Sequence, residues 1–239
     1  MSENEEAAYV LHRRPYRETS LLVDLFARGA GRLRVVARGG RRSRIAGQPF
    51  VPLVVAWSGR GGLKTLIRAE PAVPCASVPS GRALYLGLYV NELLMRLLPE
   101  WDPHPGLYDG YGRLLRRLAE EGEAEPPLRR FELQLLAELG YGFALDRTAA
   151  GVPLGPDDCY GFVPGSGLMP ASGTGQDPGG TGFRGLHLLA MAADDYRDPD
   201  TRRCAKRLLR AALAEHLGER PLRSRELFRQ RVLAAEPPG

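Results

Sequence analysis

The spacing of the apolar residues changes once along the chain, near residue 80, and this change does most to limit how the chain can fold. Before it, apolar or alternating runs of seven to ten residues are separated by turn residues such as Pro15, Gly39 and Gly40. After it, apolar residues recur every three or four positions, which is the spacing of helices. The pattern predicts an α+β chain with a β-rich first part and an all-helical second part.

The first part contains five short runs that are typical of strands. In the third run, Leu33, Val35 and Ala37 fall on one face and the arginines on the other, so that one face can pack on a core. Five strands in about seventy residues indicate a small barrel, and the OB-fold is the five-stranded barrel that commonly binds nucleic acid. An SH3-like barrel gives a similar pattern, so periodicity alone leaves both open. The expected strands lie at 7–14, 20–27, 32–38, 49–57 and 63–72.

The second part predicts six helices and one long interruption. Asp198 and Pro199 are an N-cap candidate and a first helical residue for the fifth helix. Between 143 and 184 the helical spacing lapses, and the stretch ASGTGQDPGGTG at 171–182 indicates a loop. We therefore expect an OB-fold nucleic-acid-binding domain at 1–80 and a helical domain at 81–239 with an irregular Gly-rich loop at 143–184. The expected helices lie at 82–98, 106–121, 127–140, 185–193, 200–217 and 222–234.

Positive charge is concentrated in the first third of the chain. The net charge is +5, with +7 in residues 1–80 and −2 in the rest. Such asymmetry favours a site for a polyanion, because arginine keeps its charge and donates two parallel hydrogen bonds to a phosphate. A solvated, solubilising face is the alternative. The candidate DNA-binding residues are Arg13, Arg14, Arg17, Arg32, Arg34, Arg38, Arg41, Arg42, Arg44 and Lys64.

Three aromatic residues in the same part of the chain are candidates for stacking on bases. They are Tyr16, Phe50 and Trp57, provided that they face the groove. For Trp57, which ends an apolar run, packing in the core is favoured. For Tyr16, stacking on a base and packing in the core are equally favoured.

The sequence lacks the signatures of catalysis and of cofactor binding. There is no GxSxG, GxxxxGK[ST] or HExxH motif, and GRGG at 59–62 lies between two expected strands, as a hairpin turn does. The carboxylate pairs at 157–158 and 194–195 lack the further ligands of a two-metal nuclease, the enzyme class that we weigh against DNA binding. Three scattered cysteines and four scattered histidines form no zinc motif. We expect no enzyme activity, no metal and no cofactor.

Neither a membrane span nor a secretory signal is expected. No run of about eighteen apolar residues occurs, and the opening MSENEEAAYV is acidic where a signal is basic. A cytoplasmic location follows as an expectation.

Five segments of the chain resemble the RecO family of bacterial recombination mediators. They are AYVLHRRPYRETSLLVDLF (8–26), GRLRVVARGGRRSR (31–44), LYVNELLMRLL (88–98), RRFELQLLAELGYG (129–142) and RPLRSRELFRQ (220–230), in the family's order and across nearly the whole chain. The resemblance implies an OB-fold followed by a helical domain, binding of single- and double-stranded DNA, and annealing of complementary strands. It also implies joint action with RecR in loading RecA onto DNA coated by single-strand DNA-binding protein.

Two further features follow from the resemblance. Many relatives carry a four-cysteine zinc motif after the GYG sequence, but here that segment holds only Cys159, so zinc is not carried over. The family also captures the acidic C-terminal tail of single-strand DNA-binding protein. The candidate residues for this tail are Arg129, Arg130, Phe131 and Leu135, two cations beside a helical apolar stripe. The alternative is that Phe131 packs in the core and the arginines face water.

Overall fold

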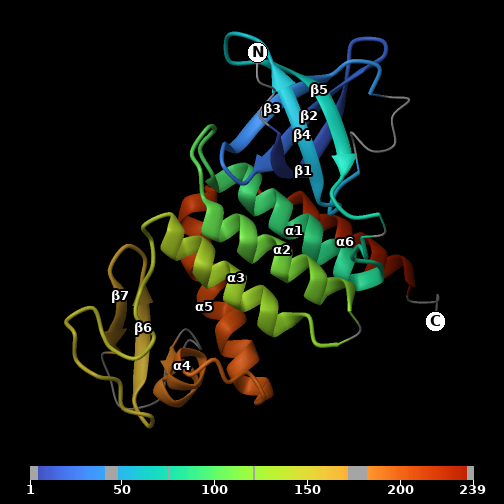
Figure 1. The fold of residues 1–239 in the computed structure, drawn as a ribbon. Coiled ribbons are helices and arrows are strands. Elements are labelled where there is room, and N and C mark those ends of the chain that lie inside the picture. Colours follow the sequence, from blue (N-terminus) through green and yellow to red (C-terminus); the bar gives the residue numbers. More distant parts are fainter. Residues whose placement is uncertain (1–4, 41–47, 75, 121, 172–181, 236–239) are drawn as a thin grey trace. The chain divides into compact units, whose positions relative to one another are not determined.

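The computed structural model describes residues 5–40, 48–74, 76–120, 122–171 and 182–235 (Figure 1). The chain divides into two compact units, one formed by residues 1–124 with 220–239 and the other by residues 125–219. The domain boundary expected at residue 80 is the point where strands are followed by helices. The two compact units instead meet between residues 124 and 125 and between residues 219 and 220.

The first unit begins with a closed five-stranded barrel. Its strands are β1 (Glu6–Tyr16), β2 (Ser20–Ala27), β3 (Gly31–Ala37), β4 (Leu53–Ser58) and β5 (Lys64–Pro71). They close in the order β1-β2-β3-β5-β4, with β3 and β5 parallel and the other pairs antiparallel. This arrangement confirms the expected OB-fold barrel.

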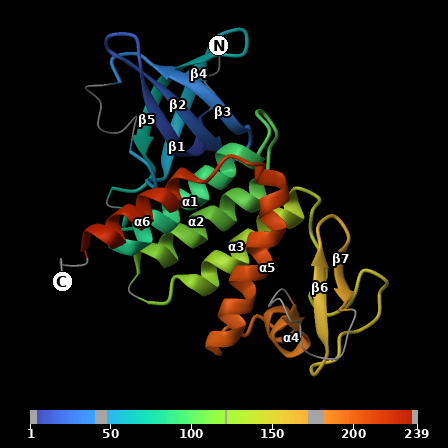
Figure 2. The same ribbon diagram turned by 180° about the vertical axis from the view of Figure 1, so that it is seen from behind.

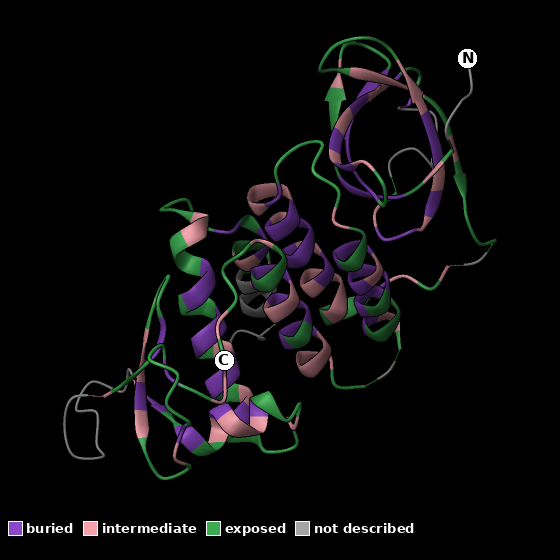
Figure 3. Ribbon diagram, turned by 60° about the vertical axis from the view of Figure 1, so that its left-hand side comes forward, coloured by how far each residue is buried: buried purple, intermediate pink, exposed green. Residues whose placement is uncertain are grey.

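The barrel interior is filled by alternate residues of each strand. Leu33 and Val35 of β3 are fully buried, whereas Arg32 and Arg34, which alternate with them, lie on the opposite face and are half-buried. This confirms the alternation predicted for the third run. Strand β2 is buried on both faces, so its outer face is also covered. Figure 3 shows the barrel as a ring whose strands are largely buried or half-buried, while several of the connecting loops are exposed.

Three helices complete the first unit, and two of them cover part of the outer face of the barrel. Tyr9 of β1 packs against Tyr108 and Tyr111, with ring centroids 5.2 and 5.0 Å away. The Tyr111 hydroxyl donates to Asn91 Oδ1, and Asn91 Nδ2 donates to the carbonyl of Leu11. These buried hydrogen bonds tie the helices to β1. The helices are α1 (Gly81–Leu97), α2 (Pro105–Ala119) and α6 (Arg223–Ala235), which packs on α1 (Figure 2).

The second unit combines three helices with a small sheet that the sequence analysis did not predict. The helices are α3 (Glu125–Glu138), α4 (Gly185–Ala192) and α5 (Pro199–Leu217). The strands β6 (Cys159–Val163), β7 (Gly167–Pro170) and β8 (Phe183–Arg184) pair in the order β7-β6-β8. The expectation of an irregular loop over 143–184 was therefore wrong for these strands. Most of the Gly-rich stretch, residues 172–181, lies outside the described residues.

The six expected helices are all present, with bounds within two residues of the prediction. The N-cap of α5 is confirmed, because the Asp198 carboxylate accepts hydrogen bonds from the amides of Asp200 and Thr201, and Pro199 is the first helical residue. Such caps satisfy amides that have no partner within the helix. Within the described residues, no helix is both long enough and apolar enough to cross a membrane.

Candidate nucleic-acid interface

Four of the candidate arginines gather at one end of the β1–β2–β3 sheet. Arg14 lies opposite Leu22, which lies opposite Val36, and the turn that holds Arg17 begins three residues after Arg14. Arg38 follows directly after the last residue of β3, at the same end of the sheet. Because neighbouring strands are about 5 Å apart, three strands bring these backbone positions within roughly 10 Å across the sheet, with the successive residues Arg13 and Arg14 on opposite faces. The end arginines, as we name this set, are Arg13, Arg14, Arg17 and Arg38, and all four are exposed.

The end arginines differ from the other candidates in their ion pairing. Within the described part of the chain, none of the four forms an ion pair. The Arg17 guanidinium lies 5.2 Å from the centroid of the half-buried Tyr16 ring, a cation–π contact that leaves the charge in place. Arg17 also has a φ of 52°, which fits the tight turn between β1 and β2. This end of the sheet therefore presents unneutralised cations beside an aromatic ring.

Two other candidate arginines are engaged within the protein. The Arg34 Nε donates to the Asp24 carboxylate at 2.7 Å, and that carboxylate is almost fully buried. The Arg32 side chain, 12% exposed, donates to the carbonyl of Leu98 and to the Glu100 carboxylate. The alternation in the sequence placed Arg32 and Arg34 on the face of β3 opposite the core, which is correct. Both charges, however, are already paired with carboxylates of the protein.

The buried carboxylate of Asp24 has a lowered pKa. Burial by itself raises the pKa, but hydrogen bonds with His12 and Arg34 and the charge of Arg34 outweigh it. Asp24 is therefore ionised at neutral pH and holds Arg34 in place on the sheet. Because the Arg34 charge is compensated, it adds little to the attraction of a phosphate.

The remaining candidates differ in how they are placed. Arg41, Arg42 and Arg44 lie outside the described residues. The Lys64 ammonium donates to the carbonyl of Gly59 and lies 5.5 Å from the ring centroid of Trp101.

The three aromatic residues that are candidates for base stacking differ in burial. Phe50 is 5% exposed and packs so closely on α1 that a Cβ at Gly87 would lie 2.9 Å from its ring. Phe50 therefore does not face a groove, which corrects that expectation. Trp57 is half-buried and packs on the barrel core, as was favoured for it. Tyr16 is half-buried, at the end where the arginines gather.

Sequence reasoning missed Trp101, in the connection between α1 and α2. Its side chain remains well exposed, and its ring lies edge-on to that of Trp57 at 6.3 Å between centroids. The signal available in the sequence was a tryptophan outside any periodic run. Periodicity does not identify such a residue, because its position depends on tertiary contacts.

The residues expected to bind an acidic tail are largely internal. Phe131 and Leu135 are 3% and 0% exposed, and Arg129 is buried with its guanidinium 2.5 Å from the Glu132 carboxylate. Arg130 is exposed and donates to the Asp194 carboxylate at 2.6 Å. The apolar stripe therefore lies in the interior, as the alternative stated, and Arg130 alone of the four faces solvent.

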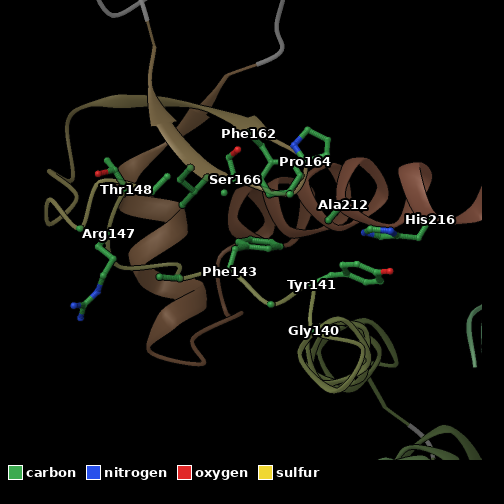
Figure 4. A pocket seen from close by; sticks show the side chains of 17 residues that line it. Gly140, Tyr141, Phe143, Arg147, Thr148, Phe162, Pro164, Ser166, Ala212 and His216 are labelled. Carbon is green, nitrogen blue, oxygen red and sulfur yellow. The ribbon is translucent and has the colours of Figure 1, made fainter. Parts of the chain in front are cut away.

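The second unit contains a separate pocket of about 380 Å³ (Figure 4). Tyr141 stacks on His216 in its lining, with ring centroids 3.6 Å apart, and Phe143 and Phe162 line it as well. The Arg147 guanidinium at its edge is paired with the neighbouring Asp146. We assign no chemistry to this pocket. Among the described residues, no three His, Cys, Asp or Glu side chains are placed to hold a metal ion.

Comparison with known proteins identifies the family. Residues 1–74 match the model of the recombination protein O N-terminal region, and residues 79–226 match that of its C-terminal region. The chain is 51% identical over 227 residues to the DNA repair protein RecO of Pseudomonas paraeruginosa (strain DSM 24068 / PA7), which covers 95% of each chain. It is 47% identical over 240 residues to the DNA repair protein RecO of Yersinia pestis (strain Pestoides F), covering 98% of this chain and 97% of the relative. With both halves matched, this chain belongs to the RecO family of DNA repair proteins.

Proposed function

We propose that this chain binds single- and double-stranded DNA through its barrel, anneals complementary strands and makes or breaks no covalent bond. The observation that carries the proposal is the set of end arginines, whose exposed charges have no ion-pair partner among the described residues. Guanidinium groups bind phosphates without reading sequence, which suits a protein that must act on any break. The OB-fold supports the same reading, since its strand faces and loops commonly bind oligonucleotides.

Annealing needs no active site in this proposal. Two complementary strands repel each other through their phosphates, and neutralising part of that charge lowers the repulsion while base pairing spreads. The protein then has only to hold a strand by its backbone and leave its bases accessible. Binding should weaken steeply with salt, because each neutralised phosphate releases counterions.

The partners proposed for this chain are those that the family implies. They are RecR, RecA indirectly, and the acidic tail of single-strand DNA-binding protein, in the cytoplasm and close to the nucleoid. For the tail, the proposed contact now centres on Arg130, because it is exposed and its carboxylate partner Asp194 is also exposed. An Arg130→Ala variant should bind an acidic tail peptide less tightly than wild type. Equal affinity would remove Arg130 from the tail site.

The experiment that tests DNA binding is a titration of labelled single-stranded DNA, followed by fluorescence anisotropy at several salt concentrations. In the test variant the end arginines are replaced by alanine. In the matched control, four surface arginines that already have carboxylate partners are replaced, so that the same charge is removed: Arg117, Arg147, Arg197 and Arg203. If four phosphate contacts are lost, the slope of log K against log salt should fall by about 3 in the test variant.

The control should keep a salt slope close to that of wild type. Equal losses in both variants would mean that net charge matters and the end of the sheet does not. Absence of wild-type binding even at low salt would favour the alternative function, a non-enzymatic scaffold that uses the barrel for protein contacts. Magnesium-dependent loss of the labelled strand would instead indicate a nuclease.

A further inference from the structure

Trp101 is fixed to the barrel although it belongs to the connection between α1 and α2. Its amide donates to the carbonyl of Arg32 at 2.8 Å, and Glu100 forms a parallel bridge with Arg32. The segment thus runs along the start of β3, whereas β5 pairs with β3 at Val35 and Val36. Trp101 has a φ of 63°, a left-handed conformation that non-glycine residues seldom adopt. The backbone contacts hold this conformation and place the indole at the edge of the barrel.

The Trp101 indole has a neighbour from the barrel on each of two sides. One neighbour is Trp57, itself packed on the barrel core. The other is the β4–β5 hairpin, whose Lys64 ammonium lies 5.5 Å from the Trp101 ring centroid. Leu63 and Ile67 of the same hairpin are 46% and 51% exposed. Trp101 itself keeps 39% of its surface exposed. An aromatic ring and a cation therefore lie beside one accessible indole, on a hairpin that also exposes apolar side chains.

The charges near the indole favour a phosphate on the hairpin side. Glu100 and Asp102 flank Trp101 in sequence. Arg32 donates to the Glu100 carboxylate, whereas the Asp102 carboxylate is well exposed. Lys64, by contrast, donates to a neutral carbonyl, so its charge is uncompensated by that contact. A ligand that offers a flat ring to the indole and an anion to Lys64 fits both sides.

We propose that Trp101 is a base-stacking residue for single-stranded DNA, with Lys64 as the contact for the adjoining phosphate. The inference rests on the proposed DNA binding and adds to it a residue outside the barrel strands. An unpaired base stacks on the indole in place of the Lys64 ammonium, which swings on its flexible stem to the phosphate. Bases inside a duplex are already stacked on their neighbours, so this contact is specific to single strands.

The test compares Trp101→Ala, Trp101→Phe and the control Tyr141→Ala, which removes an exposed ring from the second unit. Affinity is measured by anisotropy for a labelled oligo(dT) and for a duplex of equal length, across a range of salt. Trp101→Ala should bind the single strand about tenfold more weakly, with an unchanged salt slope and unchanged duplex affinity. Trp101→Phe should retain most of the single-strand affinity, and Tyr141→Ala should match wild type.

Tryptophan fluorescence provides a second measurement, which is needed if the Trp101→Ala variant folds poorly. The chain has two tryptophans, so Trp57→Phe leaves Trp101 as the reporter, and its fluorescence should be quenched by oligo(dT). In Trp101→Phe that quenching should be absent. Single-strand affinity equal to wild type in a folded Trp101→Ala, an equal loss for duplex, or an unquenched Trp101 would overturn the proposal. In each of these cases salt-dependent binding by wild type would leave the proposed function standing, whereas its absence would remove both.

Discussion

Asp24 shows how a single buried carboxylate organises the outer face of the barrel. Its folded-state pKa is lowered, so its contribution to stability is present above the pKa of an unfolded aspartate, about 4, and is lost as the pH falls through the lower folded value. We expect Asp24→Asn to lower the free energy of unfolding by about 1–3 kcal/mol at pH 7, because Arg34 loses its charged partner. Urea unfolding monitored by circular dichroism measures this.

An exposed ion pair provides the control for the Asp24 prediction. Asp109 forms an ion pair with Arg28 in which both side chains are about half exposed, so Asp109→Asn should lower the free energy of unfolding much less than Asp24→Asn does. The difference between wild type and Asp24→Asn should also shrink as the pH falls from about 4 through the lower folded-state pKa, where the native carboxylate becomes protonated. A difference that stays constant down to pH 2 would mean that shape, and not charge, is what Asp24 supplies.

At the same scale, the sequence predicted which face each residue takes but not its partner. Alternation in the third run placed Arg32 and Arg34 correctly on the face opposite the core. It could not show that Arg34 meets a carboxylate ten residues away on another strand, or that Arg32 meets one 68 residues away. These pairings depend on strand register and helix packing. For that reason a set of arginines that looked uniform in sequence separates into paired and unpaired members.

Helix α6 is held at its start by a carboxylate from another helix. Glu92 of α1 accepts hydrogen bonds from the amides of Arg223 and Ser224 and from the Ser224 hydroxyl. Glu92 thereby takes the place of an N-cap residue for amides that the helix itself leaves unpaired. We expect Glu92→Ala to increase hydrogen–deuterium exchange of the α6 amides by about five- to thirtyfold, corresponding to about 1–2 kcal/mol.

The same contact predicts a pH effect on α6. Burial raises the pKa of Glu92, but hydrogen bonds from Ser224 and Arg223 outweigh this and lower the pKa. The stabilisation is therefore complete above the pKa of an unfolded glutamate and is lost as the pH falls through the lower folded value. The protection of α6 should fall on acidification in wild type but not in Glu92→Ala. Arg117→Ala, which breaks a surface pair with Glu120 on α2, should leave α6 unchanged.

Elements with long periodic patterns were predictable from the sequence, and short ones were not. The Asp198–Pro199 start of α5 combines a cap with a preset φ, and both signals are local. Strands β7 and β8 have four and two residues and sit among glycines and prolines, so they offer no period to detect. Their pairing with β6 arises from packing on residues such as Leu188 and Leu208 of helices that come later in the chain.

For the whole molecule, the central question is whether the barrel is a domain by itself. The sequence placed a boundary at residue 80, but the outer face of the barrel is not complete there. Tyr9 and Phe26, 8% and 0% exposed, pack against Tyr108 and Tyr111 of α2. Without the helices, these two aromatic side chains of the barrel would face water. At about 25 cal/mol per Å² and roughly 150 Å² each, this exposure costs up to about 7 kcal/mol, the size of a whole domain's stability.

We therefore expect a chain ending at residue 80 to lack the cooperative urea transition of the full-length protein, or to show it at a much lower midpoint. The packing explanation is tested separately by Tyr111→Phe in the full chain. This variant keeps the ring but removes the hydroxyl that donates to Asn91, and should cost only about 1–2 kcal/mol. If the 80-residue chain unfolds cooperatively at the wild-type midpoint, the barrel is independent and the boundary at residue 80 is correct. If it does not, DNA binding by the barrel requires the helices, because they hold the sheet on which the end arginines lie.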